Sequence, residues 1–256
     1  MSDKIKKTLE IAIRAGQIML EHGAETSRVE NTINRICYSK NFDVEVFTIP
    51  TGIFLSCKHE GELYSYVKRT NSITIDLEII SKVNQFSREF VTQDMSLADA
   101  ESTLQEILNT PHFKPAIVSF FGGVAAGFFT LTFGGNLTEA FFAFITSFLT
   151  VSVVRSLHRY AGSFVRNAIG GGLNTFVALI LLALMNDPSL MLSNVVIGSL
   201  MPLVPGVALT NAFRDTISGD YVSGVSKLTE AILIAIAIAL GVGVVLHLKV
   251  LLTGSV

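Results

Sequence analysis

The sequence predicts a small α+β domain followed by an all-α polytopic membrane domain of about five transmembrane helices. The first observation is an uneven distribution of charge: residues 1–114 hold 13 Lys and Arg against 16 Asp and Glu, whereas residues 115–256 hold 6 against 5. The second is that the later part contains five apolar stretches of about 20 residues, the length needed to cross a bilayer. The chain therefore divides near Pro111–Pro115 into domains 1–114 and 115–256.

The N-terminal domain shows alternating signals for helix and strand. Residues 3–21 repeat apolar positions at helical spacing, and a turn at Gly23 follows. Ser27 and Glu30 have the spacing of a capping box, which predicts a helix that runs to about Lys40. Three short strands follow in 44–48, 53–57 and 63–67, and helices are expected at about 76–91 and 96–109, the second opened by Ser96.

The membrane domain is expected to contain five spans, at about 115–135, 138–154, 167–186, 190–212 and 228–248. Arginine and lysine lie in the links after the second and fourth spans (Arg155, Arg159, Arg166, Arg214 and Lys227), whereas the links after the first and third carry none. Because positive residues accumulate on the cytoplasmic side, the N-terminal domain is predicted to be cytoplasmic and the C-terminus external.

The fourth span is interrupted by Pro202-Leu203-Val204-Pro205-Gly206. A helix in lipid satisfies its own backbone hydrogen bonds, and proline removes a donor. Such a break is typical of transporters in which the substrate contacts a discontinuous helix. A packed proline kink is the alternative. Five helices are few for a complete transport path, so we also expect an oligomer or a second membrane subunit.

The break itself and the polar residues near it supply the candidate substrate-binding or gating residues. Asn174 is predicted within the third span, and a cluster lies at the cytoplasmic mouth of the fourth. An arginine can guide an anionic group, and a desolvated carboxyl can carry a coupling proton. The alternatives are hydrogen bonds between helices and, for the arginine, anchoring at the membrane surface. The candidates are Asn174, Pro202, Pro205, Gly206, Asn211, Arg214, Asp215, Asp220 and Glu230.

Several other functions are not indicated. The sequence contains no nucleophile elbow, phosphate loop, zinc spacing or dinucleotide turn, so we expect no enzyme activity, cofactor or metal. Neither half is strongly basic, so nucleic acid is not an expected partner. Cys37 and Cys57 are interpreted as buried free thiols. Glu25, Arg28 and Arg35 could bind an anion, but a solvated helix face or a subunit contact is the favoured interpretation, because exposed ion pairs at helical spacing are ordinary features.

Three segments resemble the signatures of the threonine/serine exporter family, in the family's order. They are Gly23–Ile36 (with Glu25, Arg28, Glu30 and Arg35), Thr48–Leu55 (with Pro50, Thr51 and Gly52), and Pro202–Asn211 followed by Arg214-Asp215 and Gly219-Asp220. The chain looks like the larger component of the split form, whose bacterial relatives include a two-component succinate exporter. In fused members a second membrane domain follows, so the resemblance implies a small, separately encoded membrane partner.

The first hypothesis is therefore a multi-pass secondary exporter in the bacterial inner membrane. The resemblance implies that it moves threonine, serine or a small dicarboxylate outward, driven by the proton motive force. A second hypothesis is a non-transporting membrane adaptor whose cytosolic domain binds a partner. A membrane-anchored hydrolase is the third, and the missing catalytic motifs disfavour it.

Overall fold

The structure, a computed structural model, describes residues 2–70, 74–93, 95–185 and 187–253. It consists of two compact units, each described here by itself. The first unit comprises Met1–Pro111 together with Gly206–Thr229, and the second comprises His112–Pro205 together with Glu230–Val256. The expected division was into residues 1–114 and 115–256. The return of Gly206–Thr229 to the first unit was not part of the expected division.

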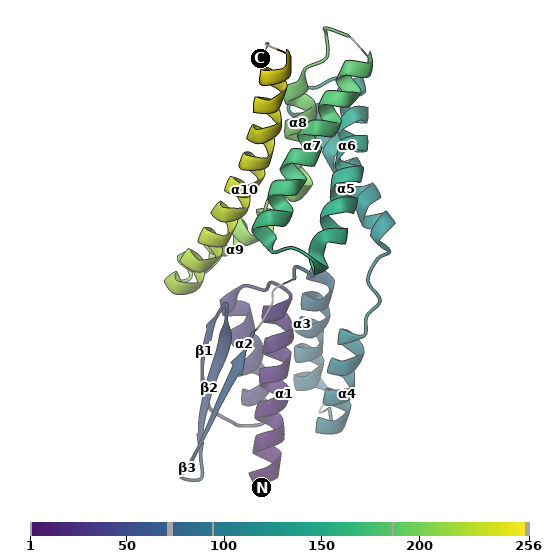
Figure 1. The fold of residues 1–256 in the computed structure, drawn as a ribbon. Helices are drawn as coiled ribbons and strands as arrows, with labels where there is room; N and C mark the ends of the chain where they lie inside the picture. Colours follow the sequence, from purple (N-terminus) through teal and green to yellow (C-terminus); the bar gives the residue numbers. More distant parts are fainter. Residues whose placement is uncertain (1, 71–73, 94, 186, 254–256) are drawn as a thin grey trace. The chain divides into compact units, whose positions relative to one another are not determined.

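The N-terminal part of the first unit is an α+β arrangement (Figure 1). Three strands form one antiparallel sheet in the order β1-β2-β3, as the alternating pattern predicts. The expected helices are present as well, and Ser96 caps α4 by accepting a hydrogen bond from the Asp99 backbone N–H. The elements are α1 (Ser2–Glu21), α2 (Thr26–Tyr38), β1 (Val44–Ile49), β2 (Gly52–His59), β3 (Glu62–Arg69), α3 (Leu77–Thr92) and α4 (Leu97–Leu108).

The core of this unit forms where α1 contacts α2, α3, α4 and the sheet. Alternate residues of β2 (Ile53, Leu55 and Cys57) point into this core, because side chains along a strand alternate between the two faces of a sheet. Cys37 of α2 is also buried, and both cysteines are free thiols. Burial raises the pKa of Cys37 to about 12, so its thiol is protonated at neutral pH.

The start of α2 differs from the expectation. The predicted capping box between Ser27 and Glu30 is wrong: the N-cap residue is Glu25, and its side chain makes no capping hydrogen bond. The Glu30 carboxylate instead accepts a hydrogen bond from the backbone N–H of Thr48 at 2.8 Å. The hydrogen-bond donor to Glu30 is therefore the backbone of β1 and not the start of its own helix.

The second unit contains most of the apolar helices. In the described part of the chain, four helices are long and apolar enough to cross a membrane, or five if Leu192–Leu203 and Gly206–Ile217 form one broken span. Four of the five expected spans therefore correspond to single helices, and the expected fourth span corresponds to the bent pair. The second, third and fifth helices are longer than expected. The elements are α5 (Pro115–Thr132), α6 (Leu137–Ser156), η1 (Leu157–Arg159), α7 (Ser163–Met185), α8 (Leu192–Leu200), η2 (Met201–Leu203), α9 (Gly206–Ile217) and α10 (Tyr221–Thr253).

The predicted break in the fourth apolar segment is present. Helix α8 ends in the short 3-10 helix η2, and Val204 is extended, with φ −64° and ψ 131°. An extended residue before a proline is expected, because the proline ring disfavours helical geometry there. A new helix, α9, begins at Gly206. The break lies where the chain passes from the second unit to the first.

Glycines allow close helix approaches within the second unit, because small residues let helix backbones come close together. A Cβ atom on Gly123 of α5 would lie 2.8 Å from the Phe144 carbonyl oxygen of α6. A Cβ atom on Gly241 of α10 would collide with the carbonyl oxygen of Ala168 and would lie 2.7 Å from the backbone nitrogen of Gly172 in α7. Both obstacles at Gly241 are backbone atoms, so a side-chain rotation cannot relieve them.

We therefore expect Gly241→Ala to separate α7 from α10 and to lower the unfolding free energy by about 1–3 kcal/mol, the usual cost of overpacking. Thermal melting of the purified chain, followed by the helical circular dichroism signal, measures this change. Gly243→Ala is the matched control, because a Cβ atom there meets nothing within 4 Å. Equal melting temperatures for the two variants would contradict the close contact.

Candidate functional site

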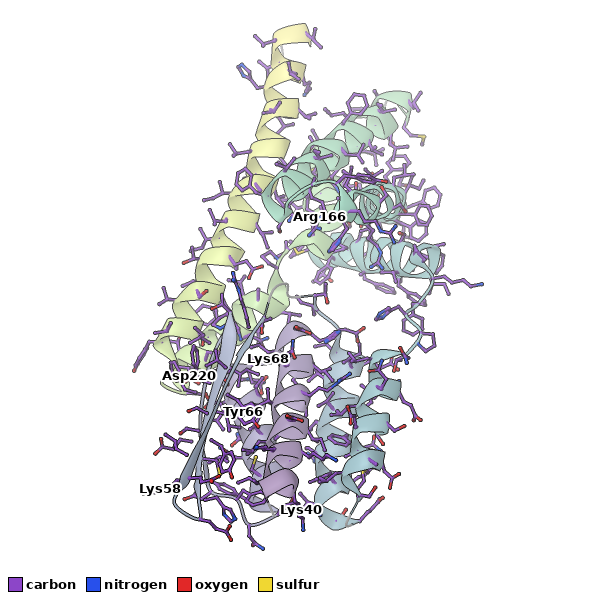
Figure 2. All side chains as sticks on the ribbon, turned by 60° about the horizontal axis from the view of Figure 1, so that its bottom comes forward. Lys40, Lys58, Tyr66, Lys68, Arg166 and Asp220 are labelled. Carbon is purple, nitrogen blue, oxygen red and sulfur yellow. The ribbon has the colours of Figure 1, made fainter. Side chains whose placement is uncertain are left out.

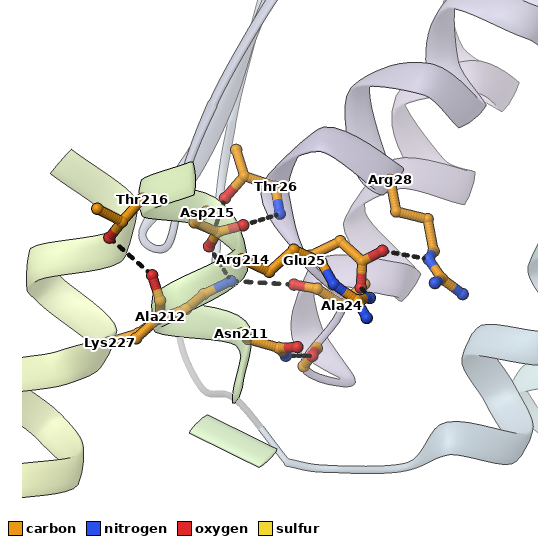
Figure 3. A network of polar contacts seen from close by, with 11 residues as sticks. Ala24, Glu25, Thr26, Arg28, Asn211, Ala212, Arg214, Asp215, Thr216 and Lys227 are labelled. Carbon is orange, nitrogen blue, oxygen red and sulfur yellow. Dashed lines mark hydrogen bonds and ion pairs between the residues drawn. The ribbon is translucent and has the colours of Figure 1, made fainter. Parts of the chain in front are cut away.

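A cluster of polar side chains joins the N-terminal part of the first unit to α9 and the start of α10 (Figure 3). All of its members belong to the first unit, although they come from segments almost 190 residues apart in the sequence. We call it the signature cluster, because most of its residues lie in the three segments that resemble the exporter signatures. It consists of Glu25, Thr26, Glu30, Thr48, Asn211, Arg214, Asp215, Asp220 and Lys227.

A buried ion pair lies at the centre of the signature cluster. Lys227 Nζ lies 2.7 Å from Asp215 Oδ2, and the two side chains are 8% and 0% exposed. Asp215 also accepts hydrogen bonds from the backbone N–H and the hydroxyl of Thr26, at 3.1 Å and 3.2 Å. Lys227 donates a further bond to the Ala24 carbonyl oxygen at 3.2 Å. Buried charges are tolerated when they are paired and hydrogen-bonded in this way.

More exposed contacts surround this pair. Arg214 Nη1 lies 2.8 Å from Glu25 Oε2, and Arg28 Nε lies 2.8 Å from the other oxygen of the same carboxylate. Asn211 donates to the carbonyl oxygen of Gly23 at 2.8 Å. Gly23 has a φ of +85°, a conformation that favours glycine, and it makes the turn between α1 and α2. The start of α2 is therefore bonded to one face of α9 through three different kinds of contact.

Two further carboxyl groups of the cluster have raised pKa values. Burial is the main cause at Glu30, where the nearby charges of Asp220 and Asp215 add to it and the bond from Thr48 opposes it. Asp220 lies in the short link between α9 and α10 (Figure 2). Its pKa is raised first by burial and then by Asp215, while Lys227 opposes the shift. Carboxyl groups that retain protons in this way are suited to proton transfer.

The raised pKa of Glu30 predicts a pH dependence of stability. The folded state holds this proton more tightly than the unfolded state, so its contribution is present below the ordinary glutamate pKa and is lost as pH rises through the raised value. We expect wild-type protein to lose stability relative to Glu30→Gln as pH rises from about 4 to about 8. Melting temperatures of both proteins measure the difference. A wild type that gains on the variant over this range would contradict the assignment.

Other predicted residues of the N-terminal domain lie outside the signature cluster. Arg35 donates to the hydroxyl of Ser87 at 3.0 Å, which joins α2 to α3. Pro50 and Thr51 form the turn between β1 and β2, and Gly52 begins β2. A Cβ atom on Gly52 would lie 3.0 Å from the Lys68 carbonyl oxygen of β3. These contacts account for the residues structurally.

The remaining candidates belong to the second unit or to its junction with the first. Asn174 is fully buried on α7 and accepts a hydrogen bond from Ser199 of α8 at 3.0 Å, while its amide nitrogen has no hydrogen-bond partner among the described residues. Pro202 lines a cavity of the second unit. Pro205 ends one unit, Gly206 begins the other, and Glu230 is exposed at the start of the second unit's part of α10. The candidate residues are therefore divided between the two units: one set lies in the signature cluster of the first unit, and the other lies in the second unit or at its junction with the first.

Sequence reasoning did not select Thr26, Thr48 or Lys227 as site residues. Thr26 and Thr48 lie within quoted signature segments, so that resemblance was an available signal. Lys227 was assigned to a cytoplasmic link, because its distance of twelve residues from Asp215 has no special meaning in a sequence. Glu139 of α6 was also missed. It is 2% exposed and accepts hydrogen bonds from Asn136, Met191 and Asn194, which joins the start of α6 to that of α8.

Four or five apolar helices of spanning length, together with a polar unit, define a multi-pass membrane protein. Comparison with known families then identifies the family: the model of the ThrE threonine/serine exporters matches residues 10–249, and the chain belongs to this family. No solved structure matches the chain.

Curated relatives carry two kinds of name. A threonine/serine exporter of Corynebacterium glutamicum is 23% identical over 97% of this chain and 53% of its own length. A protein of Klebsiella aerogenes, named as the succinate transporter subunit YjjP, is 25% identical over 91% of this chain and 90% of its own length. An Escherichia coli protein of the same name is 21% identical over 94% of both chains. The chain spans about half the length of the exporters it matches.

Proposed function

We propose that this chain is the larger component of a secondary exporter that moves small carboxylates or hydroxy-amino acids out of the cytoplasm together with a small membrane partner. Family membership supports export, and the relatives named as subunits support a partner. In this proposal the protein lies in the bacterial inner membrane, its N-terminal part is cytoplasmic, and it works as an oligomer. No enzymatic step is involved.

One observation supports a gating role for the first unit. The segment Gly206–Thr229 begins directly after the break and precedes the rest of α10, yet it packs with the N-terminal part of the chain. The buried Asp215–Lys227 pair and its bonds to Thr26 and Ala24 hold it there. This segment is covalently continuous with the break and with the rest of α10. In the proposal, a movement of the first unit therefore displaces both.

The signature cluster also offers a means of coupling export to protons. Glu30 and Asp220 both have raised pKa values, and the negative charge of Asp215 contributes to both shifts. Protonation of either group changes the net charge around the Asp215–Lys227 pair. In the proposal, this change alters the attachment of α9 to α2 and so links proton uptake to the opening of the transport path.

Counterflow in proteoliposomes tests the proposal. Vesicles containing this chain and its small membrane partner are loaded with unlabelled succinate or threonine, and uptake of the labelled compound is followed with and without a pH gradient. We expect uptake above that of protein-free vesicles for at least one substrate, with stimulation by the gradient. No uptake of either compound with the partner present would contradict the proposal and would favour the adaptor.

A further inference from the structure

The second unit contains a cavity of about 640 Å³ at one end of its helix bundle. It lies where α6 ends and α7 begins, beside the start of α5 and the η2 turn of the broken helix. Its volume is within the range of about 300–1,000 Å³ that is typical of small-molecule sites. Apolar side chains such as Phe113, Phe121 and Val154 form most of its wall.

Among the described residues, two arginines are the only charged residues that line this cavity: Arg155 at the end of α6 and Arg166 in the first turn of α7. Figure 2 labels Arg166. In the described part of the chain, neither arginine makes an ion pair with an acidic residue. Guanidinium groups stay protonated at physiological pH, so the cavity carries two uncompensated positive charges against an apolar wall. The start of α7 adds to this field, because the N-terminal end of a helix dipole is positive.

The chemistry of the wall selects the ligand. Guanidinium groups bind carboxylates through paired, charge-assisted hydrogen bonds. A molecule with two carboxylates compensates both arginines, whereas the ammonium group of an amino acid is repelled by them. The described residues of the wall offer this ammonium group no carboxylate. Asn167 lies next to Arg166 and is buried, with its amide nitrogen bonded to Ser163. The charge therefore favours a dianion over a zwitterion.

We infer that this cavity is a binding site for a small dicarboxylate, held by Arg155 and Arg166. The inference rests on the proposed function and deepens it, because it chooses between the two substrate classes named in the relatives. Pro202 and Leu203 of the broken helix line the same cavity. A dicarboxylate held there lies against η2, beside the break in the fourth apolar segment. In the proposed transport, this break rearranges.

Binding of radiolabelled succinate to the full chain in phosphatidylcholine nanodiscs tests the site. We expect Arg155→Gln combined with Arg166→Gln to weaken binding at least about tenfold, since each change removes a charge-assisted contact. Arg159→Gln is the matched control, because Arg159 is an exposed arginine of the same link that does not line the cavity. Threonine should displace the label at least about tenfold less well than unlabelled succinate.

The inference is overturned by an absence of succinate binding to the wild type, by equal binding to the double variant, or by equal displacement by threonine. A lipid headgroup is a further source of anionic groups. Phosphatidylglycerol retained by wild type but not by the double variant, with no succinate bound in phosphatidylcholine, would assign the cavity to lipid and also overturn it. Counterflow by the double variant with an unchanged KM would overturn the dicarboxylate site and leave the exporter function standing. Succinate binding that depends on the arginines, without any counterflow, would overturn the exporter function and leave the site standing.

Discussion

Replacing Asp215 by alanine is expected to lower the free energy of unfolding of the first unit by about 3–5 kcal/mol, the usual cost of removing one partner of a buried ion pair. The change leaves the Lys227 ammonium, which is 8% exposed, with the Ala24 carbonyl oxygen as its remaining described partner. The Thr26 N–H and hydroxyl lose their acceptor at the same time. An uncompensated buried charge costs more than the pair contributes when intact.

The two cysteines of the chain allow this unit to be measured by itself. Cys37 and Cys57 both lie in the core of the first unit and are 0% and 2% exposed. A thiol-reactive fluorophore therefore labels the folded chain slowly and the opened first unit quickly. The temperature at which labelling accelerates should fall in Asp215→Ala while the purified chain remains in detergent solution.

Two variants separate the buried pair from other causes. Arg214→Gln removes the neighbouring charge, whose side chain is 49% exposed, and an exposed pair contributes only about 0–1 kcal/mol. The double variant Asp215→Asn with Lys227→Met removes both buried charges, so it should recover part of the stability lost in Asp215→Ala. Equal destabilisation by Arg214→Gln and Asp215→Ala would show that the buried pair has no special weight.

Replacing both Pro205 and Gly206 by alanine is expected to abolish export in the proposed transporter while the chain stays in the membrane. Alanine restores the missing backbone donor and lifts the restriction on Val204, so the segment can continue from η2 into α9 as a regular helix. Efflux from cells loaded with labelled succinate or threonine should fall to the level of cells without the protein. The amount of chain in isolated membranes should stay unchanged.

Gly206→Ala alone is the control for this experiment. A Cβ atom on Gly206 meets nothing within 4 Å, so the single change introduces no clash and leaves Pro205 in place. It should export at a rate close to that of the wild type. Unchanged efflux in the double variant would remove the break from the mechanism, even if the family assignment stands.

Local patterns were sufficient for most elements of the fold. The strands β1 to β3 follow from alternation, and α4 begins at the Ser96 cap as predicted. The ends of the membrane helices were less well predicted. Helix α10 begins at Tyr221 rather than near residue 228, and its first turns belong to the first unit.

The candidate site shows a similar division. Asn211, Arg214, Asp215 and Asp220 were selected from the sequence and all belong to the signature cluster, but as a substrate site their role stays a prediction. Glu30 was expected to cap its own helix, yet its carboxylate bonds to Thr48 of β1. The backbone N–H of Thr48 takes the place of the helix N–H that a capping box would use. Thr48 lies on another element, so the local pattern around Glu30 gives no sign of it.

The sequence by itself determined where the chain is polar, where it is long and apolar enough for lipid, and where proline interrupts a helix. These properties depend on composition and on contacts a few residues apart. Only the tertiary structure decided that Gly206–Thr229 packs with the N-terminal part of the chain. It also decided that Asp215 pairs with Lys227 and accepts hydrogen bonds from Thr26. A buried carboxylate needs an ion-pair partner and hydrogen-bond donors. The fold brings these groups together from segments that are distant in the sequence.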